Sequence, residues 1–204
     1  MARYRGPRVK ICRALGVTLP GLTNRAVLRQ TPPGMHGAGR RGKPSDYKIR
    51  LKEKQKLRFH YGVLEGQFKR YVAEAARRKG PTGHNLISLL ESRLDNVVWR
   101  LGLAPTIPAA RQMVVHGHIE VNGRRVDRPS YNVSLNDDVS VCAKSLKKPF
   151  MQNNLDLAAS RVLPQYLEID LAVGKGKMNN TPSFGDLPFP CDLQQVVEYY
   201  SQQL

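Results

Sequence analysis

The chain has 204 residues and a formal net charge of +17, from 33 Lys and Arg against 16 Asp and Glu. An excess of this size predicts a polyanionic partner, because each phosphate that Lys or Arg neutralises releases counterions. An anionic membrane is the rival polyanion. Because long apolar runs are lacking, we expect no membrane-spanning helix and no secretory signal.

The charge is concentrated in the first part of the chain. Residues 1–91 carry a net charge of +16, residues 92–148 carry +4 and residues 149–204 carry −3. The first part is therefore predicted to bind the polyanion, and the acidic end is predicted to fold back or to contact another protein. The three cysteines are scattered and odd in number, which predicts reduced thiols in a cytoplasm-like compartment.

Residues 1–44 are rich in Gly, Pro and Arg, a composition that makes long helices improbable. We interpret them as an extended basic arm. The alternatives are a disordered arm and an arm that becomes ordered on RNA.

Residues 45–91 are predicted to form the helical part of the N-terminal domain. Ser45 and Asp46 can cap a helix that begins near Tyr47. The basic residues that follow alternate along the chain and would share one face of a strand, but good helix formers between them favour a helix. A second helix follows from the apolar spacing around Phe68, and residues 79–81 end it with a basic residue, a glycine and a proline.

Apolar spacing then predicts one helix from Thr82 to Gly102. On that helix Arg93, Asn96 and Arg100 fall within an arc of roughly 60°, which would let their polar ends reach a phosphate or a base. The alternative is a solvated helix flank with no ligand.

Residues 92–155 are predicted to form a small module of two helices on a short antiparallel sheet. Thr106 or Pro108 begins the second helix, which continues to His116. After it, Asn122 and Gly123 suit a type I′ hairpin turn, which needs positive φ at both positions.

Residues 156–204 are predicted to be a loop-rich tail that packs back on the N-terminal domain. A short helix is expected near residues 155–162, loops from 174 to 190, and a final strand or helical turn around residues 196–200. The predicted fold class is therefore α+β, with a mostly helical N-terminal domain, the small module and the tail.

No catalytic or metal-binding motif is strong, so we predict no enzyme activity, cofactor or metal. The pair His116 and His118 is a weak metal signal, and an RNA contact or hairpin packing explains it better. Asp95 lies in a tripeptide similar to the catalytic one of some pseudouridine synthases, but a structural carboxylate that pairs with a nearby Arg is the preferred interpretation. Residues 174–177 resemble a phosphate-binding loop only superficially.

Residues 90–96, 110–112 and 118–123 resemble the S4-type RNA-binding module, which also occurs in RNA-modifying enzymes and a tRNA synthetase. The remainder of the chain resembles the family of small-subunit ribosomal protein S4. That resemblance covers nearly the whole chain, and its two ends look most similar to cyanobacterial or plastid members. The matching segments outside the module are residues 3–8, 33–37, 53–58, 61–63, 79–83 and 197–201.

The resemblance implies a structural protein of the small ribosomal subunit, in the cytoplasm or in the plastid stroma. It would bind the 5′ domain of small-subunit rRNA early, nucleate assembly and contribute to translational accuracy beside proteins uS5 and uS3, near the site where mRNA enters. Some family members hold zinc with four N-terminal cysteines, but only Cys12 is present there, so no metal is expected. An RNA-modifying enzyme and a free translational repressor stay open as alternatives.

The candidate RNA-binding residues combine basic side chains of the N-terminal part with basic and amide side chains of the module. They are Arg3, Tyr4, Arg5, Arg8, Lys10, Arg13, Arg40, Arg41, Lys43, Lys48, Arg50, Lys54, Lys56, Arg58, Arg70, Arg93, Asn96, Arg100, Arg111, Gln112, His116, His118, Asn122 and Arg124.

Overall fold

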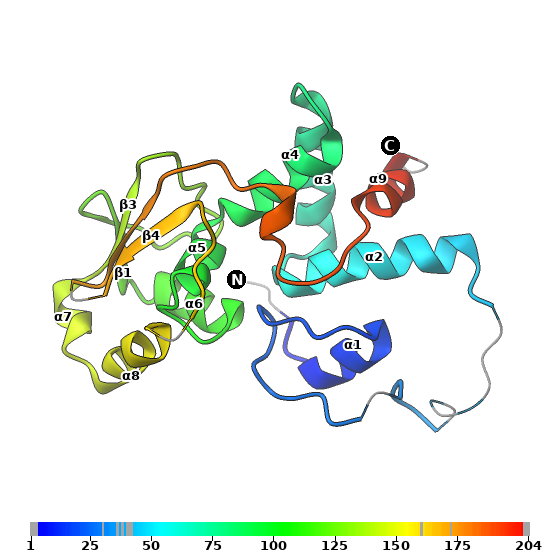
Figure 1. Cartoon of the computed structure of the whole chain (residues 1–204), viewed down its shortest axis with the longest axis horizontal. Helices are drawn as coiled ribbons and strands as arrows, with labels where there is room; N and C mark the ends of the chain where they lie inside the picture. Colours follow the sequence, from blue (N-terminus) through cyan, green and yellow to red (C-terminus); the bar gives the residue numbers. More distant parts are fainter. Residues whose placement is uncertain are drawn as a thin grey trace. The chain divides into compact units, whose positions relative to one another are not determined.

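The computed structural model describes residues 4–29, 31–35, 37, 39, 43–159, 161–171 and 173–201. The chain divides into two compact units, one formed by Met1–Leu86 with Leu187–Leu204 and the other by Ile87–Asp186 (Figure 1). Helix α4 (Thr82–Glu91) runs through this division. The helices and antiparallel strands confirm the predicted α+β class.

The first unit is helical in its described part. Its other helices are α1 (Arg8–Leu15), α2 (Asp46–His60), α3 (Glu65–Arg77) and α9 (Leu193–Ser201). The hydroxyl of Ser45 accepts from the backbone N–H of Lys48 at 3.4 Å, so the predicted cap is confirmed. Residues 47–58 are helical, as preferred. Helix α1 lies in the segment predicted as an extended arm, and it ends where Gly16 takes the left-handed conformation at φ 73°.

Helix α9 packs against α2 and also contacts α3 (Figure 1). Phe68, Val72 and Ala75 of α3 are buried, and the Phe68 ring lies 5.9 Å from that of Tyr200 in α9. The final segment, for which a strand and a helical turn were both open, is thus a helix that completes the core of this unit.

The second unit contains a five-stranded antiparallel sheet in the order β2-β1-β3-β5-β4. The strands are β1 (Ile119–Val121), β2 (Arg124–Arg125), β3 (Asp138–Val141), β4 (Leu167–Asp170) and β5 (Lys175–Met178). The helices are α5 (Leu94–Arg100), α6 (Ile107–Val115), α7 (Ala143–Leu146) and α8 (Pro149–Ala158), with a 3₁₀ turn, η1, at Phe184–Asp186.

The hairpin turn between β1 and β2 has the predicted geometry. Asn122 has φ 51° and Gly123 has φ 73°, the two positive values that a type I′ turn requires. Helix α6 begins after Thr106, whose hydroxyl accepts from the N–H of Ala109 at 3.4 Å. Both local predictions are confirmed.

The prediction of a single helix from Thr82 to Gly102 is wrong, because the helix is interrupted at Ser92 and Arg93. Arg93 is extended and bridges Asn132, and the N–H of Leu94 donates to the carbonyl of Tyr131 at 2.8 Å. These contacts replace helical hydrogen bonds, while apolar residues on both sides of the break are still buried.

The tail does not begin at residue 156. Strands β4 and β5 lie in the stretch predicted to be loop-rich, and β5 pairs with β3. A Cβ at Gly176 of β5 would lie 2.5 Å from a methyl carbon of Leu101, so the glycine allows α5 to pack closely on the sheet.

Candidate nucleic-acid interface

Four of the five predicted cations of α2 contact acidic side chains of their own unit: Arg50, Lys54, Lys56 and Arg58. Lys54 is the most deeply held, since it is 3% exposed, lies 2.8 Å from Glu65 and sits above the ring of Tyr199 at 4.6 Å. Lys48 is exposed. Helix α2 therefore uses much of its charge for its own fold and presents Lys48 to solvent.

Helix α1 and its surroundings carry further predicted residues. Arg13 donates to the carbonyl of Thr31 at 2.9 Å and so ties α1 to the segment after it. The ring of Tyr4 lies 5.4 Å from that of Phe59 in an edge-on contact. The exposed cations of this unit from the predicted set are Arg5, Lys10, Lys43, Lys48 and Arg70, and Arg8 is half-buried. Arg3, Arg40 and Arg41 lie outside the described residues.

In the second unit, Arg93 is enclosed. Its side chain is 1% exposed and donates to Asp95 through Nε at 3.0 Å and Nη2 at 2.6 Å. Arg111 reaches the same carboxylate at 3.9 Å with a side chain that is 14% exposed. This confirms Asp95 as a structural carboxylate paired with a nearby Arg, and it makes direct RNA contact by Arg93 incompatible with its burial.

Asn96 and Arg100 meet around the buried carboxylate of Glu91. Asn96 Nδ2 donates to Glu91 at 2.6 Å, and Arg100 donates to it through Nε at 3.0 Å and Nη2 at 2.7 Å. The hydroxyl of Tyr166 donates to the same group at 2.7 Å. The predicted arc of RNA-contacting side chains is thus an internal hydrogen-bond network that joins α4, α5 and the segment before β4.

The side chain of Asn122 is also used internally. Its Nδ2 donates to Asp137 at 2.8 Å, and its Oδ1 accepts from the backbone N–H of Asp138 at 2.9 Å. These bonds fix the hairpin against the turn before β3. Arg124, two residues later, is exposed.

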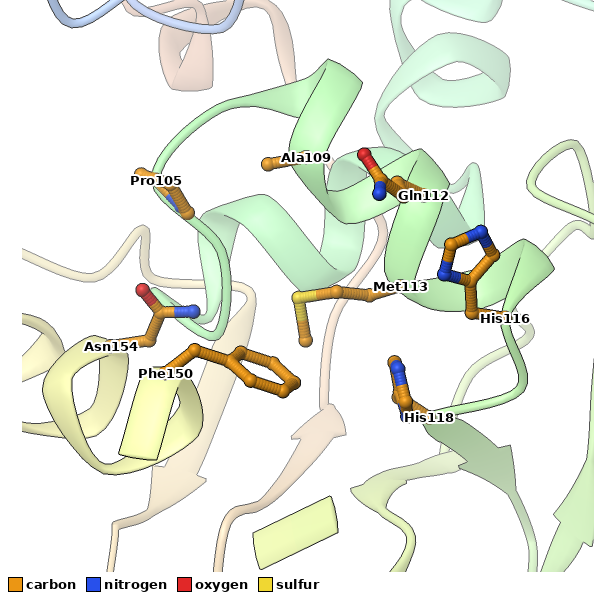
Figure 2. Close-up of a pocket in the computed structure, with 8 residues that line it drawn as sticks. All are labelled: Pro105, Ala109, Gln112, Met113, His116, His118, Phe150 and Asn154. Carbon is orange, nitrogen blue, oxygen red and sulfur yellow. The ribbon is translucent and has the colours of Figure 1, made fainter. Parts of the chain in front are cut away.

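Gln112, His116 and His118 do come together, at a groove between α6 and α8 that we call the α6–α8 groove (Figure 2). Its volume is about 400 Å³. The apolar part of the wall consists of Pro105, Ala109, Met113 and Phe150. Asn154 adds a second side-chain amide to that of Gln112. Figure 2 shows the side chains of Met113, Phe150 and His118 directed into the same space.

Positive charge surrounds His118. Its Nδ1 lies 2.9 Å from the hydroxyl of Ser145, which holds the ring in place. Burial and the nearby charges of Lys148, His116 and Arg125 lower the pKa of His118 below its ordinary value. The groove therefore combines an apolar wall with a histidine near two cations, a composition suited to an anionic ligand with a flat apolar body.

Comparisons with known proteins identify the family of this chain. Residues 3–91 match the family model "Ribosomal protein S4/S9 N-terminal domain", and residues 92–139 match the "S4 domain". The chain is 47% identical over its full length to the small ribosomal subunit protein uS4 of Methylobacillus flagellatus, covering all of that protein. It is 48% identical to uS4 of Parasynechococcus marenigrum and 49% identical to uS4c of Rhodomonas salina, each over the full length of both chains. The chain belongs to the uS4 family of small ribosomal subunit proteins.

Membership of the uS4 family confirms the resemblance and the prediction that the protein is not an enzyme, because this family consists of structural ribosomal proteins. The S4 domain match ends at residue 139, within β3, whereas the second unit continues to Asp186. In this uS4 protein, β4, β5 and α8 thus extend the structure beyond the matched domain.

Sequence reasoning missed Arg125 and Lys148, two cations near His118 of the α6–α8 groove. Arg125 Nη2 donates to the carbonyl of His116 at 3.1 Å, and Lys148 precedes α8. The signal was present, since Lys147 and Lys148 adjoin each other and Arg125 follows a predicted site residue. Their relevance depends on α8 and the hairpin lying near His118, which the sequence pattern does not show.

Within the described residues, no helix combines the length and the apolar character needed to cross a membrane. The same residues contain no group of three or more His, Cys, Asp or Glu side chains arranged to hold a metal ion.

Proposed function

We propose that this protein is a structural component of the small ribosomal subunit that binds small-subunit rRNA directly, in the 5′ domain. The exposed cations from the predicted set in the first unit support this proposal, because they are not among the cations that form ion pairs within the described part of the unit and can therefore bind phosphates. Family membership supplies the rRNA as the polyanion.

The finer parts of the proposal come from the family resemblance. We propose that the protein binds early and nucleates assembly, that it lies beside uS5 and uS3 near the site where mRNA enters, and that it contributes to translational accuracy there. Its place would be the ribosome of the cytoplasm or of the plastid stroma. Selectivity would come from the shape of the RNA and its 2′-hydroxyl groups rather than from a base code.

The proposal is tested by measuring the affinity of the full chain for the 5′ domain and for a length-matched unrelated structured RNA between 50 and 200 mM salt. If about 6–10 phosphates are neutralised, affinity should fall by roughly 10³–10⁵-fold over this range. A preference for the 5′ domain that persists at the higher salt is expected. Equal affinity for both RNAs at every salt concentration would refute specific recognition.

Two variants with the same loss of charge locate the contact surface. Lys10→Gln with Lys48→Gln should make the slope of log affinity against log salt shallower by about 1.4–1.8, at roughly 0.7–0.9 for each phosphate contact. Lys175→Gln with Lys177→Gln should leave the slope unchanged, because the carboxylates of Asp138, Glu168 and Asp170 lie on the same surface of β5 and repel phosphate.

A further inference from the structure

We propose that the α6–α8 groove holds a single unstacked base of the bound RNA, with the phosphate of that nucleotide beside Arg125 and Lys148, two cations that lie near His116 and His118. The proposal rests on the proposed function, since the RNA is the one bound by the first unit. It adds a base-binding site to a protein whose exposed cations are proposed to bind phosphates.

The size and the wall of the groove fit a nucleotide. Its volume of about 400 Å³ lies in the range that small ligands occupy, roughly 300–1,000 Å³. Phe150 lines the apolar wall and is still 40% exposed. Its ring lies 5.6 Å from that of His118. His116 continues this series of rings at 6.2 Å from His118. An exposed ring at the wall of a groove offers a stacking surface for a base.

Polar groups at the groove can bind the edge of a base. Gln112 is exposed on α6, and its amide offers both donors and an acceptor. Asn154 Nδ2 donates to the carbonyl of Leu103 at 2.9 Å, a bond that leaves its Oδ1 as an acceptor at the groove. Figure 2 places these two amides on different helices around the apolar wall.

Charge complementarity favours a nucleotide over an apolar side chain of a protein. Arg125 uses one N–H on the carbonyl of His116 and has four others, because a guanidinium carries five. A Cβ at Gly117 would lie 1.7 Å from Arg125 Nε, so the glycine lets the guanidinium lie against the backbone beside His116. Lys148 adds a second cation that acts on His118. An uncharged apolar ligand would gain no attraction from either cation, whereas the phosphate of a nucleotide would.

The test uses the full chain with the 5′ domain RNA and compares Phe150→Ala with Phe184→Ala, a phenylalanine of similar exposure at 43% elsewhere in the same unit. Phe150→Ala should weaken binding by about 5–150-fold, the range reported for loss of one stacked base. The salt slope should not change, because no phosphate contact is removed. Phe150→Tyr should restore affinity, and Phe184→Ala should bind like the parent protein.

Base-specific chemical probing of the complexes gives a second readout. One unpaired base should be protected in the parent complex and reactive in the Phe150→Ala complex. If Phe150→Ala does not fold, Gln112→Ala provides the same probing test with an exposed residue. Parent-like affinity and an unchanged probing pattern in the groove variants would overturn the proposal, and so would a changed salt slope with no change at any base. If the parent protein itself fails to prefer the 5′ domain, the proposed function fails instead.

Discussion

Replacement of Asp95 by Asn is expected to destabilise the second unit strongly. Arg93 and Asp95 are 1% and 0% exposed and share two hydrogen bonds, of 3.0 and 2.6 Å. Breaking a buried pair costs about 3–5 kcal/mol, because the remaining charge stays buried without its partner. Since whole proteins unfold at a cost of only about 5–15 kcal/mol, the variant should lose a large part of its stability.

The single tryptophan makes this measurable in the unit concerned. Trp99 lies in α5 and is 8% exposed, so its fluorescence reports on unfolding around the pair. With a denaturant slope of about 1–3 kcal/mol per molar, the urea midpoint should fall by on the order of 2 M. Asp156→Asn removes a carboxylate that is exposed on α8, and it should change stability by less than about 0.5 kcal/mol.

A double variant separates the value of the pair from the cost of leaving one charge. Arg93→Met with Asp95→Leu removes both charges and should be less destabilised than Asp95→Asn alone. If Asp95→Asn costs less than about 1 kcal/mol while the control is unaffected, the buried pair does not hold the start of α5 and this reasoning is refuted.

Three further outcomes are expected. Burial, followed by the Glu53 carboxylate, raises the pKa of Cys191 to about 12, so at pH 8 its alkylation should be roughly 10³-fold slower than in the unfolded chain, as followed by peptide mass spectrometry. Gly102→Ala should lower the free energy of unfolding by about 2 kcal/mol or more, because φ is +79° at this position and the new Cβ would lie 2.6 Å from that of Ala158. Gly66→Ala, where the new Cβ would meet open space on α3, should raise the free energy of unfolding by about 0.5–1 kcal/mol. Thermal melts measure both changes. Burial alone would raise the pKa of Glu65, but hydrogen bonds from Lys54 and Tyr200 outweigh it and lower that pKa. The unfolded chain therefore binds the proton first, near pH 4.3, and stability from Glu65 should be lost as pH falls from there through the lower folded pKa, a loss that Glu65→Gln should remove from acid titrations.

The features that could be predicted from the sequence depend on a few neighbouring residues. Asn122 and Gly123 specify a turn by their tolerance of positive φ, and Ser45 and Thr106 cap helices within three residues of themselves. Each of these is decided by bonds between residues close in the chain. Such features can therefore be predicted without knowledge of the tertiary structure.

The features that could not be predicted depend on distant partners. Arg93 and Asn96 fall on a polar flank of an ideal helix, but the helix is interrupted at Arg93, which bridges Asn132, and Asn96 is buried against Glu91. The glycine at 176 suggested a loop, whereas it lies in strand β5, which is fixed by pairing with β3 and by the approach of Leu101. Periodicity shows which side chains share a face and gives no information on what covers that face.

Lys48 and Lys54 lie in one helix and illustrate two uses of positive charge in this protein. Lys48 is exposed, whereas Lys54 is buried against Glu65 and the ring of Tyr199. Lys48→Ala should make the salt slope of RNA binding shallower by about 0.7–0.9 and change stability by less than about 0.5 kcal/mol.

Lys54→Ala should have the opposite pattern, because its charge serves the fold of the first unit. Loss of the ion pair, the cation–π contact and the packed stem should cost about 2 kcal/mol in circular-dichroism melts. The salt slope of the protein that remains folded should not change, since no phosphate can reach a side chain that is 3% exposed. If Lys54→Ala instead made the slope shallower at full stability, the α2 cations would be open to RNA and burial would be a poor guide to this interface. The count of 33 basic residues therefore overstates the number of cations available to RNA, by the number that behave as Lys54 does.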